Sequence, residues 1–234
     1  MKQNLHLLSN SGAGLPTDLW VPATGKALPE QSHQFVVAFT KTLSQKSGIE
    51  ISLESYYKTL SHLIELKEGE SFFSTNTTWE NKIETNGTGK IIGSELLIQK
   101  TKGKVTGWVG YTLSKNSRQF ENLNNANPFP YRYDRTHDIS IVLNYSINDH
   151  FSITGTWVFS TGQAITLPVM NYSVIADNNY YTNGPVGYFP QEIHVYTERN
   201  GYRMPNYHRM DFGLNHKKQI RKGERVWSLS IEVV

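Results

Sequence analysis

The sequence predicts an all-β fold, an antiparallel up-and-down transmembrane β-barrel that is present in part, with about nine strands. Apolar and polar residues alternate with period 2 through most of the chain. Short and long connections alternate between the segments that carry this pattern, and aromatic residues gather near the segment ends. Helical periodicity is nearly absent. The one amphipathic stretch, Tyr56 to Leu66, is better explained as the continuation of a strand that begins near Ile49.

The alternation is clearest from Asp138 to Ile147, where every second residue is Ile, Leu or Tyr and the residues between them are mostly polar. Successive side chains of a strand point to opposite faces, so such a segment builds one apolar and one polar surface. The same reading along the chain gives nine expected strands: Lys2–Leu8, His33–Leu43, Ile49–Leu60, Lys90–Lys100, Lys104–Ser114, His137–Ile147, Phe151–Ser160, His208–Lys217 and Glu224–Val233.

The connections between these strands alternate in length. Four are tight polar turns, at Gln45–Gly48, Thr101–Gly103, Asn148–His150 and Arg221–Gly223. Four are long: Ser9–Ser32, Lys67–Gly89, Lys115–Thr136 and Thr161–Tyr207. In an up-and-down meander alternate connections lie at the same end, so we expect tight turns at one end of the sheet and large loops at the other. Outer-membrane barrels have this asymmetry, and strands of about 9–11 residues suit a tilted membrane crossing.

Aromatic side chains are expected at the membrane interface, where one end of a ring is dry and the other is wet. The residues concerned are Phe39, Tyr57, Trp108, Tyr111, Tyr145, Trp157, Phe159 and Trp227. The alternative for these residues is the core of a soluble β-sandwich.

The composition excludes several classes of protein. The chain has 234 residues, a net charge of +3, and no Lys/Arg run long enough to indicate a nucleic-acid groove. It contains no cysteine, which rules out disulfides and thiolate metal sites. No stretch approaches the roughly 18 apolar residues of a membrane-spanning helix. Met1–His6 lacks the apolar core of a signal peptide, so either the protein is cytoplasmic or the sequence has lost its beginning.

Four stretches resemble the later part of the barrel in TonB-dependent outer-membrane receptors of the Bacteroidota type: Gly14–Pro22, Gly107–Lys115, Phe129–Asp138 and Arg199–Asp211. The resemblance implies that the whole chain, residues 1–234, is part of one receptor barrel in the bacterial outer membrane. It implies uptake of a nutrient, with outer-membrane lipid and the TonB energy-coupling complex as partners. Such receptors also have a plug domain, a TonB-coupling segment, about 22 strands and an aromatic last residue. This chain shows none of these, which indicates a fragment.

No enzyme motif is present, and we expect neither catalysis nor a cofactor. His137-Asp138 and His208–Asp211 lack metal-ligand spacing, and Arg132, Asp134, Arg135 and Asp138 are expected to hold one another at a junction between a loop and a strand. Polar-face residues are expected to face a barrel lumen, chiefly Glu50, Glu54, Glu95, Asn144, Arg209 and Asp211. For each one taken singly, plain alternation is the simpler explanation.

The longest connection, Thr161–Tyr207, is rich in the Tyr and Asn residues that recognition loops favour. We expect it to contribute nutrient contacts through Tyr172, Asn178, Asn179, Tyr180, Tyr181 and Asn183, although a solvated loop would also explain its composition. The nutrient itself cannot be read from the sequence. Two other functions stay open: a soluble lectin-like β-sandwich that binds a ligand, and a lipase or protease built on an outer-membrane barrel.

Overall fold

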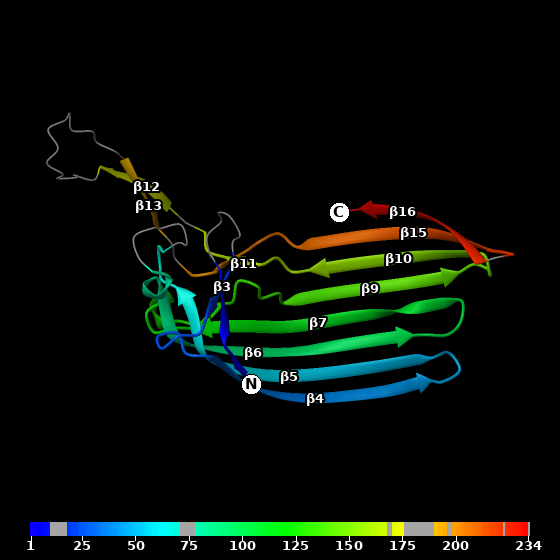
Figure 1. The fold of residues 1–234 in the computed structure, drawn as a ribbon, viewed down its shortest axis with the longest axis horizontal. Coiled ribbons are helices and arrows are strands. Elements are labelled where there is room, and N and C mark those ends of the chain that lie inside the picture. The colour runs from blue at the N-terminus through cyan, green and yellow to red at the C-terminus, as the bar shows by residue number, and fades with distance from the viewer. Residues whose placement is uncertain are drawn as a thin grey trace.

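The structure is a computed structural model, and it describes residues 1–9, 18–70, 78–167, 170–175, 190–195, 198–221 and 223–233. One antiparallel meander sheet makes up most of it, with strands in the order β1-β4-β5-β6-β7-β9-β10-β15-β16 (Figure 1). The strands are β1 (Lys2–Gln3), β4 (Glu30–Ser44), β5 (Ile49–Leu66), β6 (Ile83–Lys100), β7 (Val105–Gln119), β9 (His137–Ser146), β10 (Phe151–Ser160), β15 (Tyr207–Ile220) and β16 (Gly223–Val233). The all-β prediction and the meander order are confirmed.

Eight of the nine expected strands are present, and five of them (β4, β5, β6, β7 and β15) extend well beyond the predicted bounds. The stretch from Tyr56 to Leu66 is the second part of β5, as expected, and not a helix. The prediction for Lys2–Leu8 is wrong, because only Lys2–Gln3 pairs with β4. Leu5–Ser9 forms β2, which pairs with β3 (Asp18–Pro22) in a separate two-stranded sheet. The alternation identified an extended segment there but not its partner.

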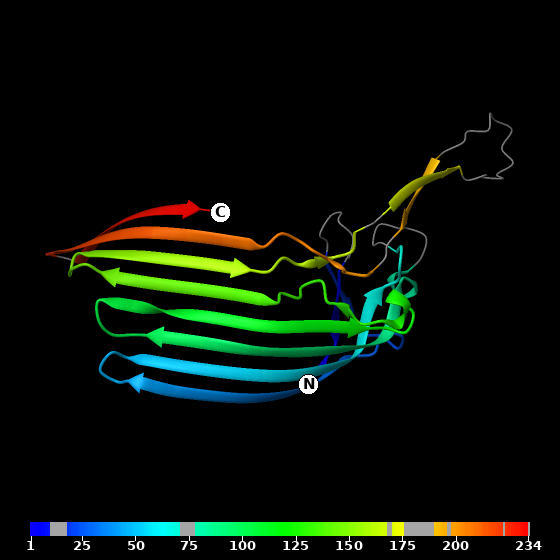
Figure 2. The ribbon, with the colours of Figure 1, turned by 180° about the vertical axis from the view of Figure 1, so that it is seen from behind.

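The tight turns lie at one end of the sheet and the long connections at the other, as the two opposite views show (Figures 1 and 2). Hydrogen bonds tie neighbouring turns together. The Thr101 amide donates to the Gly48 carbonyl over 3.0 Å, and the Lys102 ammonium donates to the Gln45 carbonyl over 2.9 Å. Gly48 has φ +61°, and a Cβ there would lie 2.3 Å from Thr101 Oγ1, so this turn requires glycine.

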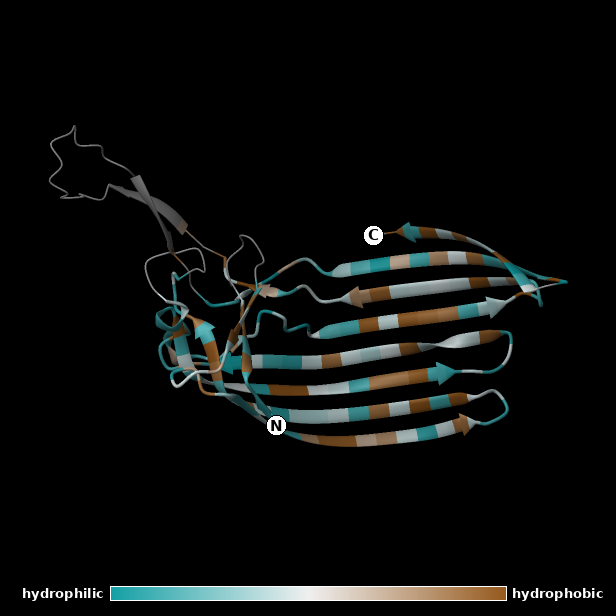
Figure 3. Cartoon of the chain, viewed as in Figure 1, coloured by the Kyte–Doolittle hydropathy of each residue, from teal (hydrophilic) through white to brown (hydrophobic). Residues whose placement is uncertain are grey.

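The register keeps one face of the sheet apolar from β4 to β16. Ile141 lies opposite both Val109 of β7 and Trp157 of β10, and Trp157 lies opposite Met210 of β15. We call this surface the apolar face; Figure 3 shows apolar residues (brown) interspersed with more polar residues (white to teal) along these strands. It comprises Phe35, Val37, Phe39, Ile51, Leu53, Tyr57, Ile92, Leu96, Ile98, Val105, Val109, Tyr111, Leu113, Ile139, Ile141, Leu143, Tyr145, Phe151, Ile153, Trp157, Phe159, Met210, Phe212, Leu214, Trp227, Leu229, Ile231 and Val233.

Many of these side chains are exposed although they are large and apolar. Val37 is 76% exposed, Phe35 74%, Trp227 66% and Leu229 65%. Isolated exposed apolar residues are ordinary, but a contiguous patch of this extent on a monomer marks an interaction surface. The expected aromatic positions fall on this face except Trp108, which lies opposite Gln99 and Val142 on the other face.

Buried apolar residues gather at the long-connection end instead of over the sheet. One cluster joins Leu8, Val21, Ala27, Ile64, Leu66 and Ile83, with Trp79 of a short 3-10 helix (Trp79–Asn81) packed against it. A second cluster joins Leu60, Leu63, Phe120, Leu123 and Phe129. The last part of β5 therefore leaves the alternating region and enters a small compact core.

Smaller elements complete this end of the structure. β8 (Phe129–Pro130) pairs with β7, and a second 3-10 helix spans Asn124–Ala126. Two more hairpin-like pairs belong to the connection after β10: β11 (Ala164–Ile165) with β14 (Tyr202–Arg203), and β12 (Met170–Ile175) with β13 (Pro190–Val195).

The sheet is open in the described residues. β16 pairs only with β15, and the outer edge of β4 pairs only with the two residues of β1. Barrel closure, which the sequence predicts, therefore stays a prediction.

At Gly107 the backbone of β7 lies so close to β9 that there is no room for a side chain. Its φ is +145°, and a Cβ would lie 2.0 Å from the Val142 carbonyl oxygen of β9. We expect Gly107→Ala to lower the free energy of unfolding by at least about 2 kcal/mol, measured by urea titration under conditions in which the chain is folded. Gly110→Ala is the matched control, since the nearest atom to its Cβ is 3.3 Å away. Equal effects of the two substitutions would contradict the strained approach at Gly107.

Candidate functional site: the polar face and the buried ion pairs at the loop end

All six residues expected to face a lumen lie on one face of the sheet, opposite the apolar face. Glu50 and Glu54 come from β5, Glu95 from β6, Asn144 from β9, and Arg209 and Asp211 from β15. We call this surface the polar face. It carries the carboxylates of the long strands, whereas none of the residues that the register places on the apolar face is Asp or Glu. That the polar face lines a lumen stays a prediction.

The register brings two of the predicted carboxylates together. Glu54 and Glu95 are cross-strand partners, and like charges in that position repel each other. Tyr56, two residues along β5, lies over Gly93, where a Cβ would be 2.5 Å from the phenolic oxygen. This part of the polar face therefore presents two neighbouring carboxylates, with the side chain of Tyr56 over Gly93 beside them.

A second group forms around Arg209. Its Nε donates to Asp211 at 3.0 Å, and its Nη2 lies 3.0 Å from Glu232 of β16. Glu232 lies opposite Asp211 in the register, so one guanidinium neutralises parts of two carboxylates. All three side chains are partly exposed, and pairs of this kind contribute little to stability.

The other two predicted lumen residues lie apart from these groups. Glu50 accepts a hydrogen bond from Thr42 near the tight turns, and Asn144 lies between Thr106 and Thr154. The described residues contain no group of three or more His, Cys, Asp or Glu side chains placed to bind a metal ion.

The strongest electrostatic feature, which the sequence did not indicate, is buried at the long-connection end. Glu65 near the end of β5 pairs with Arg118 of β7 at 3.3 Å and with Arg199 at 3.1 Å. The three side chains are 7%, 11% and 6% exposed. Arg118 also lies over the ring of Tyr131, with its guanidinium carbon 3.6 Å from the ring centroid. One carboxylate thus holds together segments separated by 134 positions in the chain.

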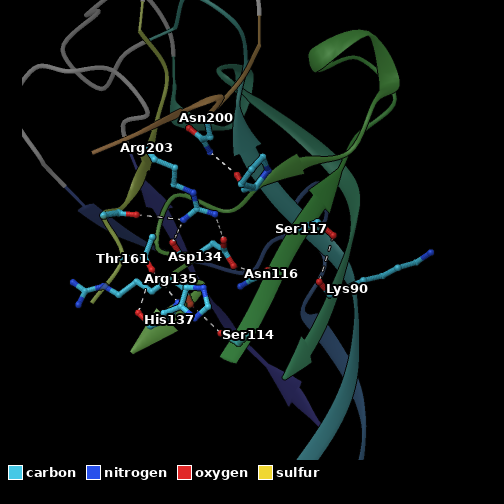
Figure 4. Close-up of polar contacts among 12 residues, drawn as sticks. Lys90, Ser114, Asn116, Ser117, Asp134, Arg135, His137, Thr161, Asn200 and Arg203 are labelled. Carbon is cyan, nitrogen blue, oxygen red and sulfur yellow. Dashed lines mark hydrogen bonds and ion pairs between the residues drawn. The ribbon is translucent and has the colours of Figure 1, made fainter. Parts of the chain in front are cut away.

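Asp134 is the centre of a second junction (Figure 4). Its buried carboxylate pairs with Arg203 and accepts the backbone amide of Asn116 at 2.5 Å. The expectation that Arg132, Asp134, Arg135 and Asp138 hold one another is wrong for the first two. Arg135 does lie 4.0 Å from Asp138, and it also donates to Ser160 at 2.8 Å. Sequence alone could not identify Arg203, which lies 69 positions from Asp134.

Two tyrosines near this junction are also held by charged partners. Burial raises the pKa of Tyr131, with the positive charge of Arg118 opposing the shift. Burial and the hydrogen bond that Tyr133 donates to Asp18, at 2.6 Å, raise the pKa of Tyr133. Both phenols therefore stay protonated through the physiological range; Tyr133 acts as a hydrogen-bond donor and the Tyr131 ring as a packing surface for Arg118.

The predicted nutrient contacts cannot be placed. Asn178, Asn179, Tyr180, Tyr181 and Asn183 lie outside the described residues. Tyr172 belongs to β12 and lies opposite Ile193 of β13, which locates its backbone only.

The contribution of Glu65 and its two arginine partners, Arg118 and Arg199, to stability can be measured directly. Glu65→Gln leaves two buried guanidinium groups without a counter-charge, so we expect a loss of about 3–5 kcal/mol in the free energy of unfolding. Asp138→Asn, which breaks a pair with both partners 42% exposed, should cost less than about 1 kcal/mol. Urea unfolding of both variants measures the difference. A Glu65→Gln variant as stable as Asp138→Asn would mean that the cluster does not hold this end together.

No family model, no curated protein and no solved structure matches this chain. Its function must therefore be inferred from the register, burial and charge of its own residues.

Proposed function

We propose that the chain forms part of a β-barrel that spans a bacterial outer membrane, in a receptor of the TonB-dependent kind that imports a nutrient. The observation that carries the proposal is the apolar face. It continues in one register through eight strands, and the described residues supply no second layer to cover it. Hydrocarbon is the cover that suits a single curved sheet with one such face.

The dimensions of the apolar region support a membrane crossing. β9 and β10 are each 10 residues long, within the range of about 9–11 residues that a tilted strand needs. β4 to β7 are longer, but their additional residues lie at the long-connection end, where β5 enters the buried clusters. On this proposal the extra length lies outside the membrane and positions the long connections.

The distribution of charge supports the same orientation of the sheet. Charged side chains on the apolar face lie toward its two borders: Lys41, Lys100, Lys218 and Arg225 on the side of the tight turns, and Lys90 and Lys115 on the side of the long connections. The middle of the face has none. Charge at the centre of a bilayer is costly, whereas Lys and Arg at the rim reach the headgroups.

The soluble β-sandwich is the main rival. A sandwich buries the inner face of one sheet against a second sheet about 10 Å away. Here the smaller two-stranded sheets are too short to cover the apolar face, and the buried clusters lie at one end of the molecule.

Nutrient transport follows from placing the polar face toward a lumen. The Glu54–Glu95 pair and the Arg209 group would then line a water-filled interior and contact a plug or a passing ligand. The connection between β10 and β15 would contribute the outer ligand contacts. The nutrient is left open, because no described cavity selects one.

Arginine substitution on the two faces tests the proposal. Leu143 and Asn144 are neighbours on β9 with opposite facing. Leu143→Arg places charge in the hydrocarbon and should reduce the free energy of folding into lipid vesicles by about 2–4 kcal/mol, whereas Asn144→Arg should be mild. Urea titration in phosphatidylcholine vesicles measures both.

Two outcomes would contradict the proposal. One is an equal penalty for the two variants in lipid. The other is an unsubstituted chain that is monodisperse and melts cooperatively in plain buffer without detergent, which would favour the sandwich.

A further inference from the structure

A belt of basic side chains follows the edge of the apolar face at the tight-turn end. It consists of Lys41 on β4, Lys100 on β6, Lys218 on β15 and Arg225 on β16; we call it the basic rim. Lys41 lies opposite Ile51, and Lys100 lies opposite Ile49, so each cation directly adjoins the apolar surface. The turns add Lys46, Lys102 and Arg221 to the same end.

The rim carries charge that the described residues leave uncompensated. No ion pair among the described residues includes Lys41, Lys100, Lys218 or Arg225. The acidic residues at this end are Asp149 in the β9–β10 turn and Glu50 and Glu224 at strand positions on the polar face, and none of them forms an ion pair with a rim residue. The positive potential of the rim is therefore directed outward, along the surface that the proposed function assigns to lipid.

Lys218 and Arg225 place two positive charges side by side in the rim, which destabilises the folded chain. They are direct cross-strand partners on β15 and β16, and like charges in this position repel each other. Both are exposed, and Trp227, 66% exposed, lies two residues from Arg225 on the same face. An anion between the two cations would relieve the repulsion, while the indole and the aliphatic stems lie against acyl chains.

We propose that the basic rim binds the phosphate groups of anionic phospholipids in the leaflet on the tight-turn side of the membrane. The inference rests on the proposed function, because it requires the apolar face to be in lipid. Phosphate suits the site chemically, since Arg forms paired hydrogen bonds to its oxygens and Lys supplies a compact charge. The rim selects lipid headgroups over dissolved phosphate because its cations lie at the border of the apolar face, at headgroup level.

Spin-labelled lipids test this with the full chain inserted in phosphatidylcholine vesicles. Lipid in contact with the protein gives a motionally restricted component of the spectrum. We expect labelled phosphatidylglycerol to be favoured over labelled phosphatidylcholine by at least about fivefold at low salt, from about 1 kcal/mol for each basic residue near the surface. High salt should weaken the preference, because it screens exposed charge.

A double variant of the rim and a matched control show whether the lipid preference comes from the rim residues. Lys218→Gln with Arg225→Gln should lower the preference by at least about twofold, although Lys41 and Lys100 remain, and should leave the restricted phosphatidylcholine component unchanged, which shows that the variant is inserted. The control is Lys58→Gln with Lys67→Gln, which removes the same charge from the polar face of β5 and from the connection that follows it. The control should keep the full preference.

The outcomes separate the two proposals. Absence of any restricted lipid would overturn the membrane-spanning function itself. Restricted lipid with no preference for phosphatidylglycerol would overturn the rim and leave the function standing. Equal losses in the variant and the control would also overturn the rim, because net charge would then explain the effect. Loss of the preference on adding millimolar inorganic phosphate, at constant ionic strength, would assign the site to free phosphate instead.

Discussion

Hydrogen-bonded register is the constraint on which the rest of this structure depends. Since side chains alternate strictly along each strand, a shift of one residue in any pairing would turn all the apolar side chains of the shifted strand onto the polar face. The pairings from β4 to β16 all keep the same phase, with the irregularities confined to the ends of the β4–β5 and β5–β6 pairs. A single surface of large apolar side chains results. On the proposed function, hydrocarbon covers this surface, which is exposed in the isolated chain.

At the long-connection end, burial and ion pairs hold the chain together in place of strict alternation. There β5 bends out of the alternating pattern, and Leu63 and Leu66 are buried in two clusters beside a carboxylate held by two arginines. Such buried ion pairs stabilise a fold little in comparison with apolar residues, but they are costly to break and geometrically selective. Glu65 and Asp134 each fix segments that come from distant parts of the chain. The connections are therefore held in defined places relative to the strands, as a binding surface built on loops requires.

Much of the sheet could be predicted from the sequence, because alternation and turn chemistry are local. The pattern around Asp138–Ser146 determines both the strand and its two faces, and the Gly48 turn is recognisable from Lys46-Ser47-Gly48. Local patterns do not specify partners, which is why Lys2–Leu8 was assigned to the main sheet although Leu5–Ser9 pairs elsewhere. Nor do they show that Trp108 falls on the polar face, or that Arg199 and Arg203 reach carboxylates on other segments. Those contacts depend on the packing of the whole long-connection end.

The central claim is that one face of the sheet is in hydrocarbon and the other is in water. Because the chain has no cysteine, single cysteines can be introduced at each position from 139 to 145 and labelled with an environment-sensitive fluorophore in vesicles. The account predicts strict alternation along β9. Labels at 139, 141, 143 and 145 should be quenched by a quencher attached to acyl chains, and labels at 140, 142 and 144 by a water-soluble one. Quenching of neighbouring positions to the same degree by either reagent would contradict the account.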